Sequence, residues 1–465
     1  MSSDQRLRDL RVEVEQVTLD IVRLVGRRDE LSRYIAEEKL RSGLPLANRE
    51  VERNLRTKIV ELCQESNQDS SFALGLLNEL IANSIRIQEK HFKPSVPLSA
   101  YHIFMKAKKL ERDGKQVIHL EVGEPDFGPP SSVMKSISDS VLSGLTGYTE
   151  SAGIIQLRNK IAAQSTHRFG QKISPDEVVI TNGGRLALYA SLATSLKPGD
   201  EVIVIDPSYP AYRDCIKQIG GRPIHLSTES EDGWIVDINK VEDAINQTTK
   251  IIVLNSPCNP TGKVLEKETI DSIVDLSIEN DIQILSDEVY SDFVFSPFAS
   301  LLEYPQCNKI VVNSFSKSYG MTGFRLGYAI SDVRTIKKIS QFQSLSLTSV
   351  SEFIQYAGLT ALDCKKEVHQ YSSLVKMRTK FLCDSLEQLP VSFHKPDGGF
   401  YIFPKIEDSS VNSIQFANRL LSEHGIAVVP GIAYGQNYSQ YFRICLCQPV
   451  TQLRQTLEGM KEGLC

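Results

Sequence analysis

Apolar residues in the first 92 positions recur at the spacing of an α-helix. The first run steps mostly by three and four residues and comprises Leu7, Leu10, Val14, Val17, Ile21, Leu24, Leu31 and Ile35. This pattern predicts one long helix, and similar patterns predict two more over about 48–66 and 70–92. Three helices of this length cannot enclose a core alone, so we expect this part of the chain to oligomerise.

The pattern changes at about residue 95, where short β-rich runs begin to alternate with amphipathic helices. The runs expected to be buried strands are 177–181, 201–205, 250–254, 283–286 and 310–314. Strands with helices between them indicate a mostly parallel sheet in an α/β fold. Ligands of such sheets bind outside the carboxyl ends of the strands, so polar motifs at those ends are candidate site residues.

Glycine and proline are distributed in a way that supports two differently built parts. Residues 1–92 hold 3 of the 28 glycines and 1 of the 20 prolines. Pro94 and Pro97 then fall in one short stretch, and each disfavours helix in the residue before it. We therefore predict a multi-domain protein, with an all-α domain over 1–93 and an α/β part over 94–465.

Charge and cysteine content exclude several classes of protein. With a net charge of −5, the chain lacks the positive excess that nucleic-acid binding requires. No run approaches the ~20 apolar residues that span a bilayer, and the charged N-terminus has no secretory pattern. The nine cysteines are scattered singly except for Cys445 and Cys447, so we expect reduced thiols, no metal site and a cytoplasmic location.

A cation interrupts the apolar stripe of the first helix. Arg28 occupies the stripe position between Leu24 and Leu31, which is costly unless its charge is paired or used. Lys39 follows on nearly the same helical face, whereas Arg11 lies about 25 Å away along the axis. Taken alone, Arg28 is compatible with a surface side chain whose stem covers apolar residues. An antiparallel helix from a second subunit would bring Arg11 and Arg28 together.

The polar residues of this part suit a small dianion that carries an ether and a hydroxyl; they are Arg11, Arg28, Lys39, Glu52, Ser84 and Gln88. The set resembles the all-helical (AroQ-type) chorismate mutases over about residues 5–92. The resemblance implies that Arg28 and the partner's Arg11 hold the two carboxylates. It also implies that Lys39 and Gln88 bind the ether oxygen and that Glu52 binds the ring hydroxyl. A Claisen rearrangement needs no nucleophile, so cations and amides in the right places are sufficient.

Two positions depart from that family's pattern. Val51 stands where another Arg is usual, and Asn48 where Asp is usual. The domain is therefore either an active mutase or a vestigial module that senses an aromatic amino acid.

Four polar motifs follow the expected strands of the second part. They are 181–185 with a Gly-Gly pair, 255–262 with two prolines, 286–290 with an Asp, and 314–328 with Lys317. Each alone is compatible with an ordinary turn, helix cap or surface lysine. In this order they resemble the fold-type I pyridoxal-phosphate (PLP) aminotransferases of class I/II over residues 95–465. That resemblance implies a large domain of about 130–340 and a smaller α+β domain from 95–129 plus 341–465.

The same resemblance assigns the cofactor contacts. Lys317 would form the Schiff base with PLP and then move a proton between the substrate Cα and the cofactor. Asp287 would keep the pyridine nitrogen protonated, and Asn259 and Tyr290 would bind the phenolic oxygen. The remaining implied contacts are Ser314, Arg325 and the amides of Gly184 and Arg185 at the phosphate, Tyr209 stacked on the ring, and Tyr148 from the neighbouring subunit.

The implied substrate contacts leave the amino acceptor open. Arg443 would bind the α-carboxylate, and Gly123 would line the entrance. Arg185 offers a cation for a distal carboxylate, as in aspartate, glutamate or prephenate. Ala100, however, stands where dicarboxylate-specific relatives often carry Thr, so an aromatic keto acid remains an alternative.

The fusion narrows the expected function. A mutase that makes prephenate, joined to an aminotransferase, predicts a bifunctional homo-oligomer of phenylalanine and tyrosine biosynthesis, with glutamate or aspartate as donor. The alternatives are an aminotransferase with a helical sensor domain, and a different PLP reaction such as β-elimination.

Overall fold

The computed structural model describes residues 3–42, 49–91 and 100–464. The chain divides into two compact units, Met1–Pro97 and Leu98–Cys465. The predicted boundary near residue 94 lies outside the described residues.

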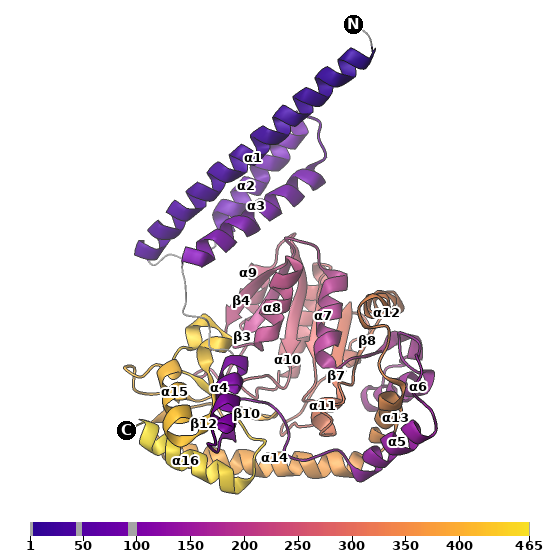
Figure 1. Cartoon of the computed structure of the whole chain (residues 1–465), viewed down its shortest axis with the longest axis vertical. Coiled ribbons are helices and arrows are strands. Elements are labelled where there is room, and N and C mark those ends of the chain that lie inside the picture. The colour runs from indigo at the N-terminus through magenta and orange to yellow at the C-terminus, as the bar shows by residue number, and fades with distance from the viewer. Residues whose placement is uncertain (1–2, 43–48, 92–99, 465) are drawn as a thin grey trace. The chain divides into compact units, whose positions relative to one another are not determined.

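The first unit contains three helices, α1 (Ser3–Ser42), α2 (Arg49–Glu65) and α3 (Ser70–His91). Both α1 and α2 pack against α3, and the N-terminal part of α1 extends beyond them (Figure 1). Few apolar side chains are buried, among them Ala36, Leu77 and Ile81. The N-terminal half of the α1 stripe is exposed instead, with Val14 66% and Leu24 65% accessible. The three predicted helices are present, but within one chain much of the apolar face of α1 remains exposed to solvent.

The second unit is built on a seven-stranded sheet in the order β2-β8-β7-β6-β5-β3-β4 (Figure 1). Only β8 runs antiparallel to its neighbours. The strands are β2 (Val178–Thr181), β3 (Glu201–Asp206), β4 (Arg222–Ser227), β5 (Thr249–Asn255), β6 (Gln283–Asp287), β7 (Lys309–Ser314) and β8 (Gly327–Ser331). The five expected strands and the mostly parallel sheet are confirmed. Two strands were not predicted from the sequence: β4, an edge strand that contains Pro223, and β8, a short strand that begins with glycine.

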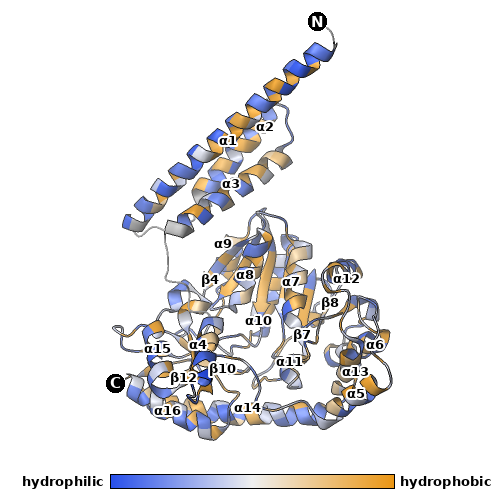
Figure 2. Cartoon of the chain, in the orientation of Figure 1, coloured by the Kyte–Doolittle hydropathy of each residue, from blue (hydrophilic) through white to orange (hydrophobic). Residues whose placement is uncertain are grey.

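Helices cover both faces of this sheet, so its inner strands β3, β5 and β6 are mostly apolar and buried (Figure 2). One face packs against α7 (Gly184–Ser195), α8 (Pro210–Ile219) and α12 (Val333–Leu347). The other packs against α5 (Ser131–Leu142), α6 (Ile155–Phe169), α9 (Ile238–Ala244), α10 (Lys267–Glu279) and α13 (Glu352–Ala361). Alternate strand residues such as Ile252 and Val253 enter opposite layers.

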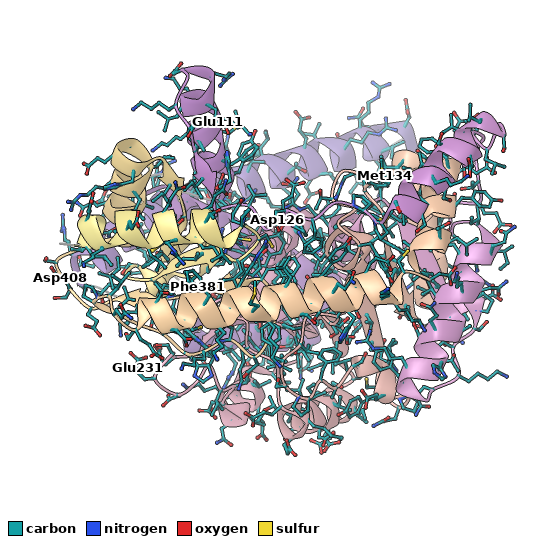
Figure 3. The ribbon with its side chains drawn as sticks, turned by 90° about the horizontal axis from the view of Figure 1, so that it is seen from below. Glu111, Asp126, Met134, Glu231, Phe381 and Asp408 are labelled. Atoms are coloured by element: carbon teal, nitrogen blue, oxygen red, sulfur yellow. The ribbon has the colours of Figure 1, made fainter. Side chains whose placement is uncertain are left out.

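A smaller α+β region lies beside the sheet. Its helices are α4 (Ala100–Arg112), α14 (Lys365–Leu386), α15 (Ser413–His424) and α16 (Val450–Leu464). Its short strands are β1 (Ile118–His119), β9 (Val391–Ser392), β10 (Tyr401–Ile402), β11 (Lys405–Ile406), β12 (Ile426–Ala427), β13 (Val429–Pro430) and β14 (Phe442–Cys445). Figure 3 shows α14 crossing this unit with Asp126 beside it, where Arg378 donates to both carboxylate oxygens at 2.6 and 2.7 Å.

Short helical turns complete the second unit, namely α11 (Phe315–Ser318), η1 (Pro175–Glu177), η2 (Leu301–Glu303), η3 (Gly431–Tyr434) and η4 (Gln436–Tyr438). Across the described ranges of both units, no helix combines the length and the apolar content needed to cross a membrane.

Gly327 allows β8 to approach the loop before α7. A Cβ at Gly327 would lie 2.5 Å from the Gly184 nitrogen and 2.6 Å from the Gly183 carbonyl carbon, which are main-chain atoms that cannot turn away. We expect Gly327→Ala to destabilise the second unit by about 1–3 kcal/mol, measured by denaturant unfolding. Gly323→Ala is the control because no atom lies within 4 Å of its Cβ position. Equal unfolding midpoints for the two variants would contradict the expected strain.

Candidate active sites

The carboxyl edge of the sheet and the small region together form a cavity of about 560 Å³. Sequence-predicted residues that line it are Gly123, Gly184, Arg185, Tyr209, Asn259, Asp287, Tyr290, Ser314, Lys317, Arg325 and Arg443. These residues come from strands and loops far apart in the chain, and the parallel strands bring their carboxyl ends to one edge. Ala100 also lines the cavity.

Lys317 lies on α11, directly after β7. Its Nζ donates a hydrogen bond to the Gly123 carbonyl oxygen. Burial lowers the pKa of Lys317 from its usual value, because desolvation disfavours the charged ammonium. A lysine with a lowered pKa has the properties of an amine that can act as nucleophile and base.

Asp287 ends β6 at the floor of the cavity and is only 8% accessible. The Tyr212 hydroxyl donates to its Oδ2 at 2.7 Å, and the Val289 amide donates to Oδ1 at 3.3 Å. Burial raises its pKa, although these donors act in the opposite direction. A cationic ring nitrogen in the cavity would stabilise the ionised carboxylate.

An anion cradle is formed where α7 begins. The first amides of α7 follow Gly183, whose φ of 79° places it in the left-handed region. A Cβ on Gly183 would lie 2.4 Å from Arg325 Nη2, so this guanidinium packs directly over the glycine. Ser314 is near the same turn, with its Cβ 3.3 Å from the position of a Gly184 Cβ.

Arg443 is a buried cation on β14, with 3% of its surface accessible. Its guanidinium donates to Asn259 Oδ1 at 3.1 Å and to the Glu121 carbonyl oxygen. The guanidinium carbon also lies 4.3 Å from the centre of the Tyr401 ring. Within the described part of the chain, its buried Nε has no hydrogen-bond partner. A substrate carboxylate would compensate this charge.

Arg185 and Tyr209 contact each other at the cavity wall. Arg185 Nη2 donates to the Tyr209 hydroxyl, and its guanidinium lies 5.8 Å from the centre of the same ring. The Tyr209 hydroxyl thus helps to hold the Arg185 guanidinium at the cavity wall. In that position the guanidinium is compatible with binding either a phosphate or a substrate carboxylate. Tyr148 is 91% accessible and does not line the cavity of its own chain.

Two functional tyrosines were not found from the sequence. Tyr212 supports Asp287, and the Tyr401 hydroxyl lies 2.8 Å from that of Tyr290. Tyr212 lies in the first turn of α8, three residues after Tyr209, and the two rings meet edge to face with their centres 5.6 Å apart. The only sequence signal for Tyr401 was the preceding Gly398-Gly399 turn.

In the helical unit, α1 and α3 bring several predicted residues together. Arg28 donates to the Ser84 hydroxyl and to the Leu80 carbonyl oxygen, and Lys39 Nζ donates to Gln88 Oε1 at 3.2 Å. Burial lowers the pKa of Lys39, while the carboxylate of Glu52 opposes that effect. These residues of one chain thus form one polar cluster on the apolar face.

Three other positions that the sequence singled out lie away from this cluster or outside the described residues. Arg11 is exposed near the far end of α1. Val51 is 61% accessible, and Asn48 lies outside the described residues.

Comparison with known proteins identifies both units. Residues 115–459 match the family described as aminotransferase class I and II. The chain belongs to this family. Residues 10–89 match chorismate mutase type II, so the helical unit is a chorismate mutase domain. The aminotransferase unit follows it in the chain.

Named relatives cover most of the aminotransferase unit. The chain is 34% identical to an aspartate aminotransferase of Thermotoga maritima, over 82% of this chain and 99% of the relative. It is 34% identical to the (5-formylfuran-3-yl)methyl phosphate transaminase of Methanocaldococcus jannaschii, over 77% and 94%. It is 31% identical to an aromatic-amino-acid aminotransferase of Thermococcus litoralis, over 75% and 92%.

Solved structures agree with this assignment. The Thermotoga maritima aspartate aminotransferase superposes with a TM-score of 0.75 at 33% identity, covering 79% of this chain and 97% of that one. The Thermus thermophilus aspartate aminotransferase with maleate also gives 0.75, at 32% identity over 80% and 97%. These relatives include both aspartate and aromatic aminotransferases, so they leave the acceptor of this chain open.

Gly123 leaves room for the Tyr401 hydroxyl. A Cβ at position 123 would lie 1.8 Å from that oxygen, which is also bound to the Tyr290 hydroxyl. We expect Gly123→Ala to displace the Tyr401 ring from Arg443 and to raise the KM of the amino donor about tenfold. Gly128→Ala in the same loop is the control, because no atom lies within 4 Å of its Cβ position. A KM unchanged in Gly123→Ala would show that the ring moves without consequence.

Proposed function

We propose that this protein is a bifunctional enzyme of phenylalanine and tyrosine biosynthesis. Its helical unit converts chorismate to prephenate, and its aminotransferase unit transaminates prephenate or an aromatic 2-keto acid with glutamate or aspartate. The observation that carries this proposal is the presence, in one chain, of the Arg28–Ser84 and Lys39–Gln88 cluster and of the Lys317 cavity.

The cavity fits PLP, which this family generally uses. Lys317 would hold it covalently, Asp287 would face its pyridine nitrogen, and the α7 amides with Ser314 and Arg325 would hold its phosphate. The close approach of Arg325 to Gly183 supports this fit, since a side chain at Gly183 would displace the cation from the cradle. When bound, PLP supplies an electron sink for the charge left as the substrate Cα–H bond breaks.

The residues of the chain supply binding and proton transfer. Arg443 binds the α-carboxylate and so orients the Cα–H bond toward Lys317, whose amine removes the proton and returns it. Tyr212 keeps Asp287 in place through its hydroxyl. When the cofactor is bound, Asn259 and Tyr290 would hold its phenolic oxygen, Tyr209 would stack on its ring, and the partner's Tyr148 would reach its phosphate.

The mutase unit works by charge placement. Arg28 and the partner's Arg11 hold the two carboxylates, while Glu52 binds the ring hydroxyl. Lys39 and Gln88 donate hydrogen bonds to the ether oxygen, where negative charge develops as the C–O bond breaks. Ser84 holds the Arg28 guanidinium in place, because its hydroxyl oxygen accepts a hydrogen bond from Arg28.

A one-pot reaction tests the whole proposal. Purified holoenzyme supplied with chorismate and glutamate or aspartate is expected to yield arogenate if prephenate is the acceptor. If an aromatic keto acid is the acceptor, this mixture yields only prephenate, and phenylalanine or tyrosine forms when phenylpyruvate or 4-hydroxyphenylpyruvate is supplied with the amino donor. Arg28→Ala should stop the conversion of chorismate to prephenate but not the transamination of a supplied acceptor, and Lys317→Ala should stop transamination and leave prephenate to accumulate. Transamination of oxaloacetate alone would contradict the aromatic assignment, and no prephenate above background would contradict the mutase assignment.

The distance between Arg11 and Arg28 on one helix predicts a site shared between two subunits. Arg11→Ala and Arg28→Ala should each be inactive as mutases. Co-refolding them in equal amounts should restore roughly a quarter of the wild-type rate, because half of the random dimers are mixed and each holds one intact site. No recovery, despite mixed dimers seen by mass spectrometry, would place Arg11 outside the site.

The second candidate is an aspartate aminotransferase whose helical unit senses an aromatic amino acid. Val51, exposed where the mutase family usually has Arg, and the aspartate aminotransferases among the relatives favour it. A transamination rate that changes with phenylalanine or tyrosine, without mutase activity, would support this candidate.

A further inference from the structure

A histidine lies between two carboxylates behind the substrate-facing segment of the aminotransferase unit. His119 ends β1, and its Nδ1 is 2.8 Å from Oε1 of Glu121. Its Nε2 is 3.0 Å from Oε1 of Glu111, near the end of α4 (Figure 3). The three side chains form one continuous hydrogen-bonded chain from α4 to the segment after β1.

The geometry of this chain suits a doubly protonated ring, because an ionised carboxylate on each side only accepts hydrogen bonds and both ring nitrogens of His119 then donate. The Glu121 side chain is 0% accessible, and its Oε2 has no partner among the described residues. An imidazolium at His119 would compensate a carboxylate at this buried position. Consistently, the hydrogen bond to Glu121 raises the pKa of His119 more than burial lowers it.

The segment that His119 anchors contacts two of the cationic side chains that line the cavity, Arg443 and Lys317. The Glu121 carbonyl oxygen accepts from Arg443, and the Gly123 carbonyl oxygen accepts from Lys317. Between these residues and β1, Leu120 pairs with Ala427 and with Cys445 through the main chain, at 3.0 Å each. Main-chain bonds thus hold the middle of the segment, while the His119 ring ties it to α4.

We propose that His119 is a positioning residue of the aminotransferase site, which as an imidazolium between Glu111 and Glu121 holds the segment whose carbonyl oxygens orient Arg443 and Lys317. The proposal rests on the substrate role given to Arg443 above. It deepens that role by linking carboxylate binding to the protonation of a residue outside the cavity, since His119 does not line it.

The groups around His119 determine the direction of the pH effect. From α4 it faces Glu111, which is itself paired with Lys108 at 2.8 Å, and the Phe104 ring at 6.2 Å. Glu121 faces it from its own segment, and the neutral Gln448 side chain donates to its carbonyl oxygen at 3.0 Å. β12 adds main-chain pairing only. As pH rises through the raised pKa of His119, the ring loses one donor and Glu121 loses compensation, so Arg443 is held less well and KM increases.

The experiment measures kcat and KM of the holoenzyme for glutamate between pH 6 and 9. We expect the wild-type KM to rise several-fold across an ionisation while kcat changes less than about twofold. Glu111→Gln removes one of the two charges that hold the proton, so the midpoint of this rise should move to lower pH by at least about half a unit. His119→Asn, which loses the charge, should show a KM raised about tenfold at pH 6.5 and a flattened profile.

The matched control is His424→Asn. His424 is another half-buried histidine of the same region, with Nδ1 3.6 Å from Oε2 of Glu462. Its KM profile should equal that of the wild type, and the ionisation of glutamate itself is common to all variants and cancels.

Two results would overturn the proposal. One is an unchanged midpoint in Glu111→Gln, a variant at a partly exposed position whose folding is checked by its melting temperature. The other is a His119→Asn profile that matches the control. Neither result bears on the role of Lys317, because a failure of the proposed function would appear instead as transamination that survives in Lys317→Ala.

Discussion

Two buried cations, Lys317 and Arg443, face one cavity, and the rest of the aminotransferase unit is arranged to hold them there. Both are taken out of water and both are positive, so each needs fixed acceptors in the free protein. The acceptors are neutral rather than carboxylates: a main-chain carbonyl oxygen of the 119–123 segment for each cation, and Asn259 Oδ1 in addition for Arg443. A carbonyl dipole satisfies the donors without cancelling the charge, which leaves the cations available to a substrate carboxylate or a cofactor.

The helical unit also holds cationic side chains against apolar surface, but these side chains are less buried. Arg28 and Lys39 lie on an apolar face, where Ser84, Leu80 and Gln88 supply neutral acceptors. Much of the same face on α1 remains exposed in one chain, and Arg11 lies at its far end. A second copy that covers this face would bury apolar surface and complete the set of cations in one step, so association and catalysis would depend on the same contact.

The fold followed from local patterns because each element carries its own period. The stripe from Leu7 to Ile35 became α1, and the run 250–254 became the centre of β5, since burial on one face or on both selects residues at that spacing. The edge strand β4 was missed because one side of it is less buried and Pro223 weakens its pattern. The small region was the hardest part to predict, because strands of two residues, such as β10 and β12, are too short to show an alternation of apolar and polar residues.

The sequence by itself determined the two-part organisation and the strand-end motifs, including the one that contains Lys317. Those features are local, because a loop or a helix face is formed by residues that are close together in the sequence. Only the tertiary structure decided which distant groups support them: Tyr212 on Asp287, Tyr401 on Arg443, and the His119 chain behind both cations. The first two contacts join residues that are 75 and 42 positions apart in the chain, and the hydrogen bond that ties the His119 segment to Arg443, at the Glu121 carbonyl oxygen, spans 322 positions. No periodic pattern spans such separations, because the contacts arise only when the sheet and the small region have closed around the cavity.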